Sequence, residues 1–80
     1  MEARAYFEQA DGKLDRDGKE LCRVAKLCGV KPYYLYMVAA GHKRPSAELA
    51  AVMEHATAAA INRRDVLPDF LWDAPPQAAA

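Results

Sequence analysis

The stretch that decides the fold is LCRVAKLCGVKPYYLYMVAA, residues 21–40. Apolar residues in its first half recur at the i, i+3, i+4 and i+7 spacing of an amphipathic helix, namely Leu21, Val24, Ala25 and Cys28. Gly29 can take the left-handed conformation that ends a helix, and Pro32 suits the first position of the next one. The stretch therefore predicts two short helices joined by a tight turn, which is the helix-turn-helix pattern.

This pattern also needs a small residue where the two helices cross and apolar residues that hold both helices on the rest of the domain. Ala25 is small and stands at the crossing position. The anchoring positions are filled by Val24, Cys28, Val30, Leu35 and Val38. An ordinary helical hairpin without a role in DNA binding is the alternative interpretation.

The flanking sequence predicts further helices. An apolar stripe in residues 3–10 predicts a first helix, and the charged residues 13–17 predict a connection. Asp17, with Glu20 three residues later, is the expected N-cap of the helix that contains Leu21. Ser46 is the expected N-cap of a fourth helix, whose apolar stripe is Leu49, Val52, Met53 and Ala56.

Asn62 is the expected cap of one more short turn over residues 63–67, which Pro68 stops. We therefore expect an all-α fold, a compact four- to five-helix domain of residues 1–72 that contains the helix-turn-helix. Residues 73–80 are expected to form a flexible tail. The apolar residues Phe70, Leu71 and Trp72 either contact a second copy of the chain or cover the core, and covering the core is the favoured interpretation.

Charge is segregated along the chain although the net charge is zero. Residues 13–44 hold eight Lys or Arg against three acidic residues, a balance of +5, and the rest of the chain carries −5. A basic face of this kind fits a nucleic-acid partner. The alternative is two solvated faces without a partner.

Catalysis and metal binding are not indicated. Cys22 and Cys28 would lie about 240° apart on one helix, which prevents a disulfide between them. We expect Cys28 to be a small core residue and Cys22 to be partly exposed. His42 and His55 do not stand at zinc-ligand spacing from the cysteines. No cofactor is expected, and an enzyme is a distant third hypothesis.

No run approaches the roughly 20 apolar residues of a membrane span, and the first residues do not resemble a secretion signal. We therefore expect a cytoplasmic protein without a membrane partner.

If the helix-turn-helix binds DNA, the helix of residues 32–40 enters the major groove. Its helical period turns Leu35 inward and turns other side chains towards the DNA, and phosphate contacts are expected on both flanks. The DNA-facing residues are then Lys31, Pro32, Tyr33, Tyr36 and Met37, and the phosphate contacts are Lys19, Lys43 and Arg44. Tyr34 is equally suited to packing between helices.

Four segments carry a resemblance to a known family, namely LCRVAKLCGV (21–30), GHKRPSAE (41–48), HAT (55–57) and INRRDVLPD (61–69). In them the chain resembles the small Cro-like repressors and prophage regulators of the YdaS type. The resemblance implies a five-helix domain of bacterial or phage origin that represses a phage promoter, with the second and third helices on the operator. By position it implies the same DNA-facing residues from Lys31 to Met37, with Lys43 and Arg44 in the following loop.

The chain departs from that family in two places. Small polar residues usually begin the family's recognition helix, where this chain has residues 31–34, KPYY, so the family's base preference does not transfer. The connection formed by residues 12–18 is also longer than the one in that family.

We expect a double-stranded DNA operator as the partner, to which the protein binds as a homodimer on half-sites about 34 Å apart. The second hypothesis is an antitoxin-like or adaptor module whose tyrosine-rich helix binds another protein.

Overall fold

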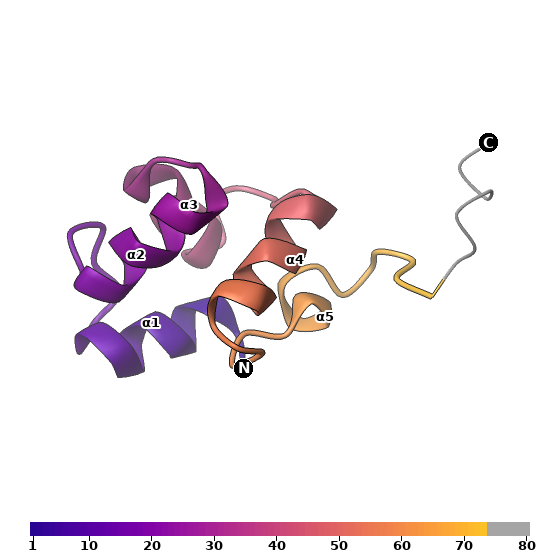
Figure 1. The fold of residues 1–80 in the computed structure, drawn as a ribbon, viewed down its shortest axis with the longest axis horizontal. Coiled ribbons are helices and arrows are strands. Elements are labelled where there is room, and N and C mark those ends of the chain that lie inside the picture. The colour runs from indigo at the N-terminus through magenta and orange to yellow at the C-terminus, as the bar shows by residue number, and fades with distance from the viewer. Residues whose placement is uncertain (74–80) are drawn as a thin grey trace.

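The computed structural model describes residues 1–73, which form five helices and no strand (Figure 1). The helices are α1 (Ala3–Asp11), α2 (Lys19–Cys28), α3 (Pro32–Ala39), α4 (Ala47–Ala56) and α5 (Arg63–Val66). The expected all-α fold is confirmed, with helix ends close to those predicted. None of the helices in residues 1–73 is long and apolar enough to cross a bilayer. Apart from Asp73, the expected tail of residues 73–80 lies outside the described residues.

Helix α2 lies at the centre of the fold. It contacts α1, α3 and α4, and α5 packs on α4 (Figure 1). The largest fully buried side chains come from α1 to α4 and from the loop before α5 and form one cluster, namely Phe7, Leu21, Val24, Leu35, Met53 and Ile61. Because α3 has its buried residues against this core, its opposite side faces solvent.

The turn between α2 and α3 has the geometry that the sequence predicts. Gly29 has a φ of +72°, in the left-handed region, and the N–H of Val30 donates to the carbonyl of Ala25 at 3.0 Å. This bond closes the end of α2 in the manner of a Schellman motif. Ala25 is fully buried, and its small side chain leaves room for α3 to approach α2 closely. Cys28 is half-buried against the core.

The N-cap of α2 differs from the prediction. Asp17 does not cap the helix; Gly18 occupies the N-cap position without a side-chain bond. The carboxylate of Asp11, the last residue of α1, accepts from the amides of Glu20 at 2.9 Å and Leu21 at 3.2 Å. These amides belong to the first turn, where donors lack intrahelical partners and a negative charge is favourable. Asp11, a residue of the preceding helix, therefore caps α2 in place of the expected Asp17.

Replacing Gly18 with alanine is expected to lower the free energy of unfolding by about 1 to 2 kcal/mol. A Cβ at Gly18 would lie 2.2 Å from the Oδ2 atom of Asp11, so the carboxylate would have to leave the two amides. Urea denaturation measures the change. In an Asp11→Ala background the same substitution should cost much less, because no cap is left to displace. Equal costs in the two backgrounds would contradict the capping role.

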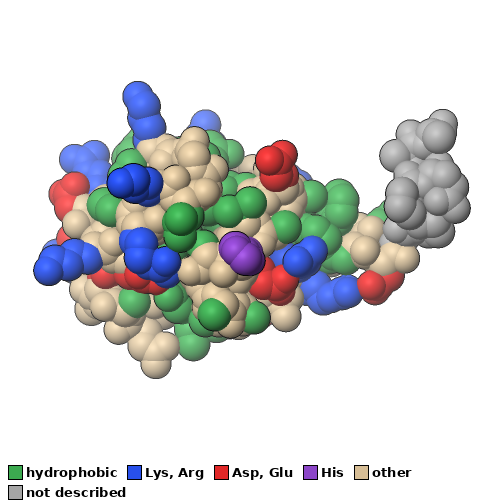
Figure 2. Space-filling view, in the orientation of Figure 1, with side chains coloured by type: hydrophobic (Ala, Val, Ile, Leu, Met, Phe, Trp, Pro, Cys, Tyr) green, Lys and Arg blue, Asp and Glu red, His purple; other side chains and the backbone are tan. Residues whose placement is uncertain are grey.

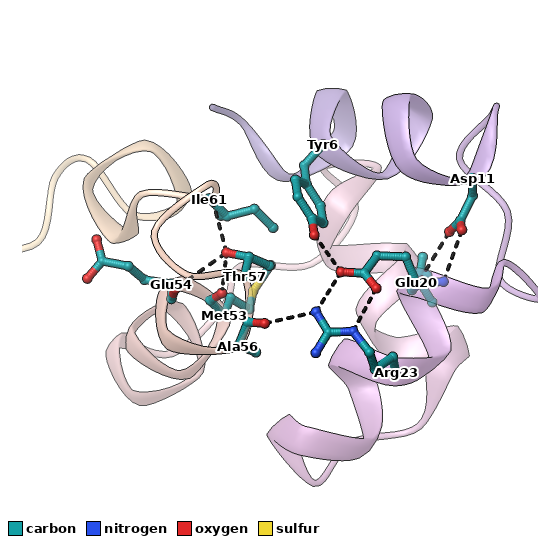
Figure 3. A network of polar contacts seen from close by, with 10 residues as sticks. Tyr6, Asp11, Glu20, Arg23, Met53, Glu54, Ala56, Thr57 and Ile61 are labelled. Atoms are coloured by element: carbon teal, nitrogen blue, oxygen red, sulfur yellow. Dashed lines mark hydrogen bonds and ion pairs between the residues drawn. The ribbon is translucent and has the colours of Figure 1, made fainter.

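A polar network joins α1, α2 and the end of α4 (Figure 3). The hydroxyl of Tyr6 donates to the carboxylate of Glu20. Arg23 donates to the same carboxylate through Nε at 2.7 Å and Nη2 at 2.6 Å, and Nη2 also donates to the carbonyl of Ala56 at 2.9 Å. Glu20, expected to support the N-cap, instead links α1 to α2, and Arg23 extends this link to the end of α4.

This network predicts a pH dependence. The hydrogen bond from Arg23 holds the pKa of Glu20 below its ordinary value of 4.5. A carboxyl group with a lowered pKa in the folded state adds stability above the unfolded pKa, and this stability is lost as the pH falls through the folded one. Arg23→Met should therefore lower the free energy of unfolding at pH 7, and the loss should shrink as the pH falls below about 4.5. Denaturation at several pH values measures the trend, and Lys26→Met, on the same helix, should show none.

The expected caps of the last two helices are confirmed. The Oγ of Ser46 accepts from the amide of Leu49 at 3.0 Å, and the Oδ1 of Asn62 accepts from the amide of Arg64 at 2.8 Å. Between the helices, the buried hydroxyl of Thr57 accepts from the amide of Ile61 at 3.0 Å. This bond holds the loop that brings Ile61 into the core.

The residues Phe70 to Trp72 do not cover the core, so the favoured interpretation of this segment was wrong. Leu71 is 74% exposed and Phe70 is 44% exposed. The Trp72 ring lies against that of Phe70, with 4.5 Å between centroids, and its Nε1 donates to the carbonyl of Leu67 at 3.0 Å. The core is already filled by side chains from α1 to α4 and by Ile61 and Leu67 on either side of α5, and Leu67 is the last buried residue among residues 1–73.

Candidate nucleic-acid interface

The first turn of α3 presents its side chains to solvent. Lys31, at the N-cap position, is exposed, and Pro32 is the first helical residue and half-buried. Tyr33 is 53% exposed and Tyr34 is also exposed. Both lie outward because Leu35, on the other side of the helix, is fully buried. Tyr34 thus belongs to the surface, although packing between helices was an equal alternative.

The second turn of α3 is less exposed than we expected for residues that contact DNA. Tyr36 and Met37 are half-buried, and Tyr36 packs against the core. The Tyr36 ring also stacks on that of Tyr33, at 6.4 Å between centroids and 16° between planes. The carbonyl of Met37 accepts from the amides of His42 at 2.9 Å and Lys43 at 3.3 Å. The loop with Lys43 is therefore fixed at the end of α3.

The N-terminus of α3 has backbone donors that are left without a partner by residues 1–73. No acidic residue stands in its first turn, and Lys31 provides no side-chain cap. Pro32 has no N–H, and among residues 1–73 the amides of Tyr33 and Tyr34 have no hydrogen-bond partner. Free amides and the helix dipole at such an end favour an anion.

The cations fall into two groups by their partners. Five arginines form ion pairs within residues 1–73, namely Arg4, Arg23, Arg44, Arg63 and Arg64. No such ion pair includes Lys13, Arg16, Lys19, Lys26, Lys31 or Lys43. In Figure 2, basic side chains gather over the end of the molecule that α2 and α3 form. The uncompensated positive charge therefore belongs to the helix-turn-helix and its flanking loops.

Arg44 differs from its expected role as a free phosphate contact. Its Nη2 lies 2.7 Å from the Oδ1 of Asp69, and the hydrogen bond lowers the pKa of that carboxyl. Both side chains are about two-thirds exposed, so this ion pair is weak and open to competition. A phosphate that bound Arg44 would first have to displace Asp69. Lys43 beside it is exposed and unpaired within residues 1–73.

The structure adds residues that the sequence did not place in the site. Arg16, in the connection between α1 and α2, has its guanidinium carbon 5.8 Å from the centre of the Tyr33 ring. Lys13 and Arg16 both line a groove beside Tyr33 and Tyr36. Their charge was evident in the sequence, but their position next to α3 was not.

No family model matches the chain, and neither a curated protein nor a solved structure matches it. The resemblance to the Cro-like regulators stays a prediction. The fold and the site define a small helical domain with a helix-turn-helix, surrounded by basic side chains that form no ion pair within residues 1–73.

Proposed function

We propose that this protein is a sequence-specific regulator of transcription, most simply a repressor, that binds double-stranded DNA through α3. The observation that carries the proposal is the distribution of unpaired cations. Six Lys and Arg side chains on and beside α2 and α3 are without ion pairs in residues 1–73, whereas the other five arginines pair with carboxylates. Positive charge that is left free around an outward-facing helix is available to DNA phosphates.

In the proposed complex, the outward side of α3 lies in the major groove, and phosphates are bound on its flanks. Lys31 and Tyr33 lie at the leading end of the helix, where base contacts concentrate. Lys19 and Lys43 are exposed near the start of α2 and the end of α3 and suit phosphate contacts. The unpaired amides at the start of α3 are further phosphate donors.

Sequence preference in this complex has to come from an unusual set of side chains. Residues 32–39, PYYLYMVA, contain no Asn, Gln or Arg, the residues that pair bidentately with base edges. The hydroxyl of Tyr33 can hydrogen-bond a base or a phosphate, and Met37 can contact a thymine methyl group. DNA shape and deformability therefore contribute a substantial part of the specificity.

Operator binding at useful affinity requires two copies of so small a domain, on half-sites about 34 Å apart. Phe70 and Leu71 provide an exposed apolar surface on the described part of the chain. Since this segment does not cover the core, its contact with a second copy becomes the favoured interpretation. Sedimentation of the wild type and of Leu71→Glu, with and without DNA, tests it.

A protein partner is the second candidate function, and the exposed aromatic pair Tyr33 and Tyr34 favours it. Aromatic side chains are enriched at protein interfaces. The two functions differ in salt dependence. Phosphate contacts make log affinity fall with log salt by about 0.9 per phosphate, whereas an aromatic protein interface is far less sensitive.

Fluorescence anisotropy with labelled duplexes tests the proposal. One duplex has the sequence that flanks the gene and the other is a scrambled control, and both are titrated over a series of salt concentrations. We expect the native duplex to bind more tightly and its affinity to fall steeply with salt. Absence of binding at low salt would refute the proposal and leave the tyrosine surface as a protein-binding site.

Asp69→Asn is expected to raise affinity about threefold for every duplex, because it releases Arg44 from the weak ion pair that competes with a phosphate. The same anisotropy titration measures it. Asp73→Asn is the matched control, since Asp73 pairs with Arg64 of α5 at 2.8 Å and its loss removes the same charge. Equal gains from the two variants would attribute the effect to net charge alone.

A further inference from the structure

The connection between α1 and α2 lies against the exposed tyrosines of α3. A groove of about 300 Å³ is formed between them. Lys13, Leu14, Asp15 and Arg16 line one side of the groove, and Tyr33 and Tyr36 line the other. Residues 17 to 23 positions apart in sequence thus form one surface at the start of α3.

Arg16 has a defined position in this groove. Its guanidinium carbon lies 5.8 Å from the centre of the Tyr33 ring, within the range of a cation–π contact. The Tyr33 ring is itself held by stacking on Tyr36. A guanidinium that packs by its face keeps its N–H edge free, and that edge matches the oxygens of a phosphate.

The backbone around Arg16 is held by local bonds. The amide of Asp17 donates to the Oδ1 of Asp15 at 3.0 Å, and the amide of Gly18 donates to the carbonyl of Asp15 at 2.9 Å. The thiol of Cys22 donates to the carbonyl of Arg16 at 3.5 Å. The connection therefore presents Arg16 from a formed turn that is tied to α2.

In the lining of the groove, basic side chains outnumber acidic ones. No ion pair within residues 1–73 includes Lys13 or Arg16. Asp15 is the one acidic residue that lines the groove, and its carboxylate already accepts the Asp17 amide. The groove thus has two cations and one carboxylate next to the first turn of α3.

We propose that Arg16, held over Tyr33 and assisted by Lys13, binds a backbone phosphate of the DNA next to the start of α3. This inference rests on the proposed function and extends the interface to a segment outside the helix-turn-helix. The contact is with the backbone, so it adds affinity and fixes the register of α3 without reading a base.

The test compares Arg16→Ala, Arg16→Lys and the control Arg64→Ala on the native and scrambled duplexes over a salt series. Arg16→Ala should weaken binding about three- to tenfold on both duplexes and reduce the log–log salt slope by about 0.9, the value of one phosphate. Arg16→Lys should keep the slope and recover part of the affinity, because it keeps the charge and loses the planar fork. Arg64→Ala, in α5, should change neither quantity.

Three results would overturn the inference, and they are distinguishable. If Arg16→Ala behaves like Arg64→Ala while the wild type binds DNA, Arg16 makes no contact and the proposed function stands. If Arg16→Ala weakens only the native duplex and the salt slope is unchanged, Arg16 reads a base instead. If the wild type itself does not bind either duplex, the proposed function and this contact fail together.

Discussion

Leu35→Ala is expected to lower the free energy of unfolding by about 2 to 5 kcal/mol, the range for truncating a buried leucine. In a domain of this size that corresponds to a fall in melting temperature of ~10 °C or more. Leu35 is fully buried, with 0% accessible surface, and it is the largest buried side chain of α3. Truncation leaves a cavity at the contact of α3 with α2. Thermal and urea denaturation measure the loss.

Leu27→Ala is the matched control, because it removes the same atoms from the neighbouring helix. Leu27 is 57% exposed, and surface substitutions of this kind change stability by no more than about 0.5 kcal/mol. A similar cost for both variants would show that α3 is not held by the burial of Leu35. DNA affinity of Leu35→Ala should also fall, since the position of α3 depends on this contact.

The helices were predictable because their signals are local. Gly29, Ser46 and Asn62 each act on backbone groups within five residues of themselves, so their roles can be read from short segments. The burial of Leu21 and Leu35 follows from helical periodicity. These local signals are sufficient for the helix-turn-helix.

Contacts between distant segments were not predictable in this way. Asp11 caps a helix that begins eight residues later, which depends on the angle between α1 and α2. Asp17, at the usual cap spacing, was the better candidate by pattern alone. For Phe70 and Leu71, apolar character is equally compatible with covering the core and with facing solvent, and only the space already filled by other residues decides.

The candidate site shows the same division. Exposure of Lys31 and Tyr33 follows from the phase of α3. The ion pair between Arg44 and Asp69 joins residues 25 positions apart, and the contact of Arg16 with Tyr33 depends on the path of a charged connection. The sequence therefore indicates which side of α3 faces outward, and the fold determines which cations beside it are without an ion pair in residues 1–73.

The double substitution Lys43→Glu with Arg44→Glu is expected to weaken binding about 100-fold, and equally for native and scrambled duplexes. Lys43 is unpaired within residues 1–73, and its amide is bound to the end of α3 through the carbonyl of Met37. Reversal therefore places two negative charges where the proposed complex has the DNA backbone, and glutamate at position 44 would also stand beside Asp69. The anisotropy titration at moderate salt measures the loss, and the salt slope should fall by about 0.9 for each phosphate contact removed.

The matched control is Arg63→Glu with Arg64→Glu, the other pair of adjacent arginines or lysines near a helix end. These two residues lie in α5 and already bind Glu54 at 2.7 Å and Asp73 at 2.8 Å. Their reversal changes net charge by the same amount and should weaken DNA binding only a few-fold, provided that melting curves show a folded protein. Equal losses from both pairs would mean that net charge, and not the loop after α3, governs binding. Tyr33→Ala supplies the contrast within the site, because it should change the preference between duplexes more than the affinity they share.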